Sequence, residues 1–156
     1  MIFMGIDPGE NGGLVCLDGD CVTFTTMPKT EREVWDWFRL RGDEFRGQIV
    51  ATIEKVGGYI GTPHPSSAMF NFGWSYGGLR MAMIGNNIIP EAVAPRTWMA
   101  GVGIPHRKRD ESKTQFKQRM KDVAERLYPR LKLTLATSDA LLIATYCQWK
   151  HEGRFE

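Results

Sequence analysis

The sequence of 156 residues lacks any run of about 20 apolar residues, the length that a membrane-spanning helix needs. Its first residues, 1–5, also lack the basic region and the long apolar stretch of a secretory signal. We therefore expect a cytoplasmic protein with no membrane partner.

Cysteine and histidine are scarce, with three of each. The cysteines, Cys16, Cys21 and Cys147, show no metal-ligand spacing, so we expect buried, reduced thiols and no structural zinc. The histidines, His64, His106 and His151, fall in predicted loops or near the chain end. They give no support to a Ser-His-Asp site, although His106 adjoins a basic run and is a candidate for phosphate contact.

The composition is that of a globular protein, with 42% hydrophobic and 24% charged residues. Internal repeats and low-complexity segments are absent. Since a domain typically takes roughly 100 to 150 residues, we expect one domain over residues 1–156.

The two ends of the chain differ in charge. Residues 1–95 carry 7 basic against 11 acidic residues, and residues 96–156 carry 13 against 7. The ten basic residues of the segment 107–132 are Arg107, Lys108, Arg109, Lys113, Lys117, Arg119, Lys121, Arg126, Arg130 and Lys132. Their density suits contact with a polyanion such as nucleic acid, although a solvated helix face would look similar.

The chain begins with three short β-branched runs at residues 2–6, 13–17 and 21–26, separated by turn compositions. They predict an antiparallel meander. Thr30, with Glu33 three residues later, predicts the capped start of a helix that ends at Gly42. The apolar run 48–53 predicts a parallel strand buried on both faces.

Helices and strands alternate in the rest of the chain. We expect helices over residues 68–85, 111–128 and 138–149, a strand over 88–93 and a short helical turn from Pro95. A basic surface loop covers residues 101–110. The predicted fold is α/β, with a mixed five-stranded sheet of three antiparallel and then parallel strands, flanked by helices.

Three acids stand at the ends of predicted elements in apolar surroundings. Asp7 ends the first strand, Glu54 ends the buried strand, and Asp139 lies in the first turn of the last helix. Each alone can be a turn former or a helix cap. If the two strands are neighbours and the helix packs across them, the three carboxylates form a site of oxygen ligands suited to Mg²⁺. A pair of such cations can promote the hydrolysis of a phosphodiester.

Ordered motifs carry a family resemblance. Met-Gly-Ile-Asp-Pro-Gly at residues 4–9, Ile-Glu-Lys-Val at 53–56 and Ser-Asp-Ala-Leu-Leu-Ile-Ala at 138–144 resemble the RuvC class of Holliday-junction resolvases, in the ribonuclease H-like superfamily. Residues 66–77, the Pro-Arg-Thr-Trp turn at 95–98 and Leu-Tyr-Pro at 127–129 resemble the phage-encoded and chloroplast members more than the bacterial enzyme.

The resemblance implies a ribonuclease H-like fold and a homodimer that nicks four-way DNA junctions in pairs with Mg²⁺ or Mn²⁺, in the cytoplasm of a bacterium or a phage-infected host. Asp7, Glu54 and Asp139 fall on the family's metal-binding acids. Lys117 falls on or near a lysine beside the scissile phosphate, with Lys113 as the neighbouring candidate one turn earlier.

One departure concerns the fourth acid that the family has three or four residues before the last one. Leu135 and Ala136 occupy those positions. Three interpretations follow: three carboxylates suffice, Glu10 substitutes, or one metal is held weakly and activity is low. A branched-DNA-binding protein with little nuclease activity is therefore the alternative.

The remaining candidates would face DNA. Lys113, Lys117 and the basic residues Arg107, Lys108 and Arg109 would neutralise phosphates. Aromatic residues recur at every second position from residue 70 to 76, a spacing that on a helix cannot bury them all. They either pack a dimer contact and the core, or contact unpaired bases, for which Phe70 and Phe72 are the candidates.

A sugar-kinase-like or actin-like ATPase is a further alternative, because the Gly-rich start of the chain also resembles the phosphate loop of that superfamily. Such proteins need two similar lobes around the nucleotide, each close to this whole chain in size. The length therefore argues against that alternative.

Overall fold

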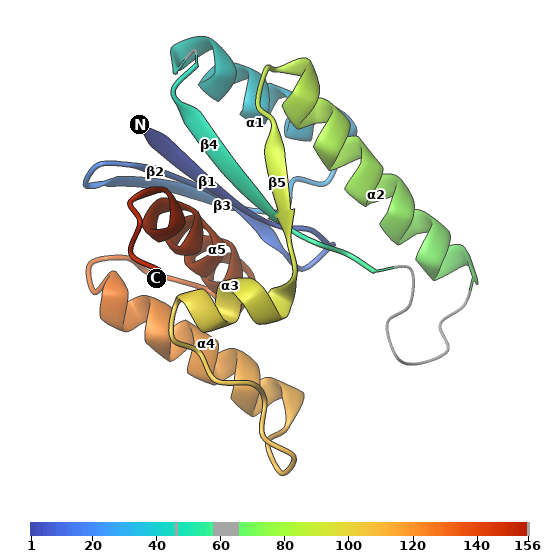
Figure 1. Ribbon diagram of the computed structural model, residues 1–156. Coiled ribbons are helices and arrows are strands. Elements are labelled where there is room, and N and C mark those ends of the chain that lie inside the picture. The colour runs from blue at the N-terminus through green and yellow to red at the C-terminus, as the bar shows by residue number, and fades with distance from the viewer. Residues whose placement is uncertain (46, 58–65, 156) are drawn as a thin grey trace.

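The computed structural model describes residues 1–45, 47–57 and 66–155. Its centre is a mixed five-stranded sheet with the strand order β3-β2-β1-β4-β5, and helices lie on both faces (Figure 1). The predicted α/β architecture is confirmed. His64 and the predicted loop around it lie outside the described residues. Within them, no helix is both long and apolar enough to cross a bilayer.

The strands follow the predicted order. β1 (Ile2–Asp7), β2 (Gly13–Asp18) and β3 (Cys21–Thr26) form the antiparallel meander, and β4 (Ile49–Glu54) and β5 (Pro90–Val93) add in parallel beside β1. β5 begins later than expected, because the amide of Ile88 still donates to the Met83 carbonyl at the end of a helix. The expectation of buried thiols was wrong for Cys21, which is exposed on edge strand β3.

In the described part of the chain, five helices connect and cover the strands: α1 (Glu31–Glu44), α2 (Ser66–Gly85), α3 (Pro95–Gly101), α4 (Lys113–Leu127) and α5 (Leu135–His151). The capping box of Thr30 and Glu33 is confirmed. Gly42 does not end α1. It lies against α2's end instead, where a Cβ on Gly42 would be 2.7 Å from the carbonyl oxygen of Asn86.

The last helix begins earlier than predicted. Thr134 caps it, with Thr137 as its reciprocal partner, so α5 starts at Leu135. Asp139 is therefore the fifth residue of α5 rather than a residue of the first turn. The predicted start at Ser138 is wrong, because the Ser138 hydroxyl donates to the Thr134 carbonyl inside the helix.

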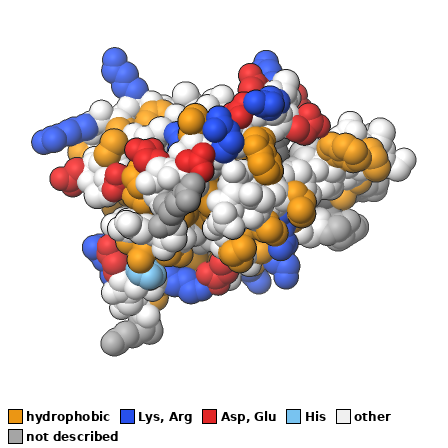
Figure 2. Space-filling model, turned by 90° about the horizontal axis from the view of Figure 1, so that it is seen from above, with side chains coloured by type: hydrophobic (Ala, Val, Ile, Leu, Met, Phe, Trp, Pro, Cys, Tyr) orange, Lys and Arg blue, Asp and Glu red, His pale blue; other side chains and the backbone are white. Residues whose placement is uncertain are grey.

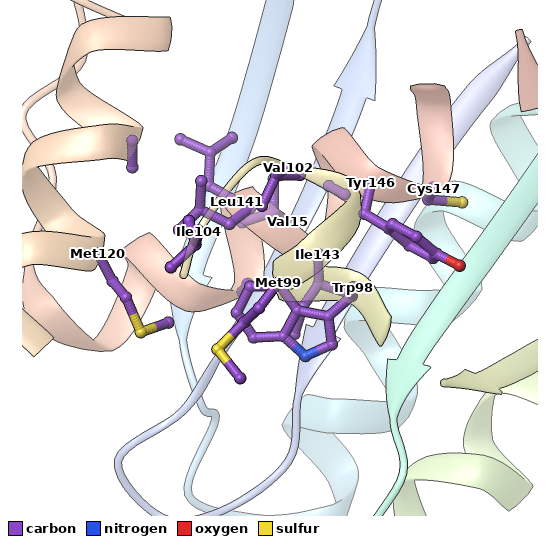
Figure 3. Packing of buried hydrophobic residues seen from close by; sticks show 14 of the residues in the cluster. Val15, Trp98, Met99, Val102, Ile104, Met120, Leu141, Ile143, Tyr146 and Cys147 are labelled. Carbon is purple, nitrogen blue, oxygen red and sulfur yellow. The ribbon is translucent and has the colours of Figure 1, made fainter. Parts of the chain in front are cut away.

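The two faces of the sheet bury different side chains of β1. Ile2, Met4 and Ile6 pack with α1 and α2, whereas Phe3 packs on the opposite face with α3, α4 and α5. Since side chains alternate along a strand, Gly5 and Asp7 share the face of Phe3. The second core, which contains Trp98 beside Met99, fills the space between α3, α5 and the sheet (Figure 3).

Candidate active site

Two of the three predicted acids lie at the carboxyl ends of neighbouring parallel strands. In the parallel pair of β1 and β4, Ile6 lies opposite Ile53, and Asp7 and Glu54 are the next residues of their strands. Alternation also places Asp7 and Glu54 on the face that α5 covers. Neighbouring strands therefore bring together two carboxylates that are 47 positions apart in the chain.

The third acid reaches these strand ends because α5 approaches β1 closely. A Cβ on Gly5 would lie 2.2 Å from the carbonyl oxygen of Ala140 and 2.2 Å from the amide nitrogen of Ala144. Only glycine permits that approach. Asp139 directly precedes Ala140, so the approach places its carboxylate beside the end of β1, where Asp7 stands.

Lys117 on α4 contacts the third acid. Its ammonium donates to Oδ2 of Asp139. Asp139 is 5% exposed, whereas the side chain of Lys117 is 46% exposed. The other carboxylate oxygen of Asp139, Oδ1, is buried and has no hydrogen-bond partner among the described residues.

Glu54 has a partner that the sequence analysis missed. The indole Nε1 of Trp98 donates to Oε2 of Glu54 over 2.8 Å. Trp98 lies in the helical turn that begins at Pro95 and is buried in the core. The available signal was the chemistry of tryptophan itself, since a buried indole N–H requires an acceptor.

The electrostatics of Asp7 show that the acids influence one another. Burial raises the pKa of Asp7 well above its usual range, and the charges of Asp139 and Glu54 raise it further. Lys117 acts in the opposite direction. Like charges near one another raise a carboxyl pKa in this way, so the four groups form one electrostatic cluster.

The other members of the cluster respond in the same sense. Burial raises the pKa of Glu54, against the hydrogen bond from Trp98, and burial raises the pKa of Asp139, against Lys117. Burial alone would lower the pKa of Lys117, but the carboxylates, with Asp139 foremost, raise it. At each of the three carboxyl groups the net result is a raised pKa, with burial as the largest cause.

The residues present fit a divalent cation in their chemistry. All the donors are carboxylate oxygens, which are the ligands of Mg²⁺ and Mn²⁺, and Oδ1 of Asp139 is buried without a partner. Over the described ranges, no three acidic, histidine or cysteine side chains are grouped closely enough to form a ready-made metal site. The ammonium of Lys117 instead contacts Asp139, one of the three predicted metal ligands.

No carboxylate stands at the positions of the missing fourth acid. Leu135 is exposed in the first turn of α5, and Ala136 follows it. Glu10, the substitute considered above, is exposed and lines a groove with Phe72. The acids that raise the pKa of Asp7 are Asp139 and Glu54 rather than Glu10.

The aromatic residues of α2 divide as their spacing predicts. Phe70 and Trp74 are 66% and 63% exposed, with ring centroids 6.0 Å apart, whereas Tyr76 packs against the core. Phe72 is partly buried in a groove of about 710 Å³ between α2 and the start of α1. A Cβ added to Gly9, in the turn after Asp7, would lie 3.7 Å from the ring of Phe72.

The predicted basic loop is held by α4. Arg119 forms an ion pair with Glu111, with Nε 2.9 Å from Oε1, and also donates to the carbonyls of Pro105 and His106. Glu111 in turn accepts from the amide of Lys108. Four of the DNA-binding candidates are exposed there: Arg107, Lys108, Arg109 and Lys113. The sequence analysis counted Arg119 only as one more positive charge.

Comparisons with known proteins agree with this fold. No family model matches the sequence, and no curated protein matches it. Among solved structures, T. thermophilus RuvC in complex with a Holliday junction substrate is similar, with a TM-score of 0.63 and 14% identity over 98% of this chain and 97% of that one. A second Thermus thermophilus RuvC structure gives 0.57 and 17% over the same shares. At such identities the likeness establishes the ribonuclease H-like fold.

Proposed function

We propose that this protein is a metal-dependent endonuclease that resolves four-way DNA junctions by paired nicks. The observation that carries the proposal is the joint placement of Asp7, Glu54 and Asp139, from two strand ends and a helix, in one electrostatic cluster. The similar RuvC structure that contains a Holliday junction supports the choice of substrate. The phage-encoded or chloroplast-like branch rests on the sequence motifs alone.

The three acids are assigned to hold Mg²⁺, with Mn²⁺ as a substitute. If bound as a pair, such ions would activate a water and stabilise the leaving oxygen of a phosphodiester. Trp98 orients the Glu54 carboxylate through its hydrogen bond and leaves the second oxygen of Glu54 for a ligand. Lys117, or Lys113 one turn earlier on α4, supplies positive charge to the scissile phosphate.

The DNA backbone is assigned to the loop before α4. Arg107, Lys108 and Arg109 are exposed there, and phosphate neutralisation by such residues gives affinity that falls steeply with salt. Phe70, which is exposed near the start of α2, and Phe72, beside the turn after Asp7, are assigned to unpaired bases at the crossover.

We further propose that the chain is a single nuclease domain and acts as a homodimer through α2. Hydrophobic side chains gather on the right-hand part of Figure 2, where α2 runs. Trp74, Met81 and Ile84 of this helix are exposed. Aromatic residues and methionine are enriched in interfaces. Light scattering at micromolar concentration tests this assignment, which a monomeric mass would contradict.

The decisive experiment incubates a labelled four-way junction with the protein and Mg²⁺ or Mn²⁺. Wild type should produce symmetric nicks, whereas Asp7→Asn should bind the junction without cutting it. Asp20→Asn, which removes an exposed carboxylate from the turn between β2 and β3, is the matched control. Cleavage by the Asp7 variant would show that the assignment is wrong.

A branched-DNA-binding protein with weak or no nuclease activity is the second candidate. Leu135 and Ala136 favour it, because the first turn of α5 offers no fourth carboxylate. The same assay separates the two functions. Binding of the junction without nicks by wild type, in either metal, would select the binding protein.

A further inference from the structure

The two carboxylate oxygens of Asp139 differ in their hydrogen bonding. Oδ2 accepts from the ammonium of Lys117, which reaches across from α4. Oδ1 is buried, and no residue in the part of the chain that the structure describes offers it a hydrogen bond. A buried carboxylate oxygen without a partner is destabilising, so this face of Asp139 is open to a further positive group.

The charges of the cluster do not balance. Asp7, Glu54 and Asp139 contribute three negative charges when they are ionised, and Lys117 contributes one positive charge. The ammonium of Lys117 donates to Asp139 within the cluster, which makes Lys117 a counter-ion of these acids. The ammonium thus compensates part of the charge that a divalent cation would otherwise compensate.

We propose that Lys117 is the internal counter-ion of the metal-free site and competes with the divalent cation for Asp139, so that metal binding releases its ammonium for a DNA phosphate. This inference rests on the proposed function. A cation next to Asp139 repels the ammonium and takes over its electrostatic role. Metal and DNA binding are then coupled through one side chain.

The side chain of Lys117 can make this exchange without repacking the core. It is 46% exposed, on the half-buried edge of α4 between Phe116, which packs against the core, and exposed Gln118. Lysine carries its charge on a flexible four-carbon stem, so the ammonium can leave Asp139 while the stem stays at the surface. A more rigid arginine fork would be a poorer exchangeable partner.

The test measures Mn²⁺ binding by calorimetry on the DNA-free protein. Lys117→Met should bind Mn²⁺ about tenfold more tightly than wild type, within the usual range of coupling between two ligands. Lys113→Met is the matched control, because it removes the same charge from an exposed position one turn earlier on α4 and should leave the affinity near that of wild type. Equal or weaker binding by the Lys117 variant would overturn the inference.

A second measurement keeps the result independent of folding defects. Without metal, Lys117→Met should lower the thermal midpoint, and saturating Mn²⁺ should raise that midpoint more than in wild type. Lys117→Gln, which keeps a polar group, should show the same order. A smaller rise than in wild type for both variants would contradict competition.

Asp139→Asn separates the two proposals. If wild type binds Mn²⁺, the Asp139 variant loses binding and Lys117→Met matches wild type, the metal site stands and the counter-ion role is wrong. If wild type and Lys117→Met both fail to bind Mn²⁺, the metal-dependent nuclease is wrong, and the inference falls with it.

Discussion

Gly5 of β1 lies against the backbone of Ala144 in α5, so closely that a Cβ on Gly5 would be 2.2 Å from the Ala144 amide nitrogen. Real Cβ atoms do not come so near a backbone atom, so any side chain at this position must push helix and strand apart. The same approach places Asp139 beside the end of β1. Both the packing of α5 on the sheet and the geometry of the candidate site therefore depend on glycine, which has no side chain, at position 5.

The first prediction concerns this contact. Gly5→Ala should lower the free energy of unfolding by about 3 kcal/mol or more, because the clash involves backbone atoms that cannot rotate away. Urea denaturation measures it. Gly77→Ala is the control, since its added Cβ on α2 meets nothing within 4 Å and should stabilise the helix by about 0.5 to 1 kcal/mol. Equal stability of the Gly5 variant and wild type would refute the argument.

The second prediction concerns Asp7 and pH. Its pKa in the folded protein lies well above the usual value of 3.8, so the folded state binds this proton more tightly than the unfolded chain does. The contribution of Asp7 to stability is therefore lost as pH rises from about that value through the folded pKa. Asn cannot titrate.

In metal-free buffer, Asp7→Asn should accordingly gain stability over wild type as pH rises towards neutral. Thermal unfolding at several pH values between acid and neutral measures the difference between the two proteins. A difference that stays constant with pH would show that folding does not raise the pKa of Asp7.

The third prediction concerns the hydrogen bond from Trp98 to Glu54. This bond lowers the pKa of Glu54 against the effect of burial, so Trp98→Phe should raise that pKa further. It should also destabilise the fold by about 1 to 3 kcal/mol, because Glu54 loses a partner. NMR titration of the Glu54 carboxyl group measures the shift.

Trp149→Phe provides the comparison for the third prediction, because Trp149 packs against the same core and the change removes the same atoms. It should leave the titration of Glu54 close to that of wild type. An unchanged titration in the Trp98 variant would mean that the indole only fills space.

The fourth prediction concerns the clip that Arg119 forms on the basic loop. Arg119→Met removes the ion pair to Glu111 and the bonds to the carbonyls of Pro105 and His106. Amide exchange at Lys108, which donates to Glu111, should become faster because the loop opens more often. Junction affinity should fall more than in Arg126→Met, which removes one exposed charge at the other end of α4. Equal losses would reduce Arg119 to a simple phosphate contact.

Local signals in the sequence predicted most of the elements. Turn residues and β-branched runs placed the meander, and the Thr30 and Glu33 pair placed the start of α1. The errors were also local. Thr134 and Thr137 form a capping box that we did not consider, which moved Asp139 from the first turn to the second. Gly42 suggests a helix end by its residue type, but it lies inside α1 at a point of contact with Asn86.

The candidate site was predictable in its list of acids and, through the family resemblance, in Lys117, but not in its contacts. The sequence placed Asp7 and Glu54 at strand ends, and the parallel register made them neighbours. The contact of Lys117 with Asp139, the bond from Trp98 to Glu54 and the clip of Arg119 join residues 22, 44 and 8 positions apart. Spacing within one element gives no information about such pairs.

The sequence by itself determined which segments become strands and helices and which side chains carry the charge, because turn propensity, capping and hydrophobic period act over a few residues. Only the tertiary structure decided which charges meet. That outcome depends on how closely α5 can approach β1 and on where α4 then packs, which are properties of surfaces assembled from distant parts of the chain.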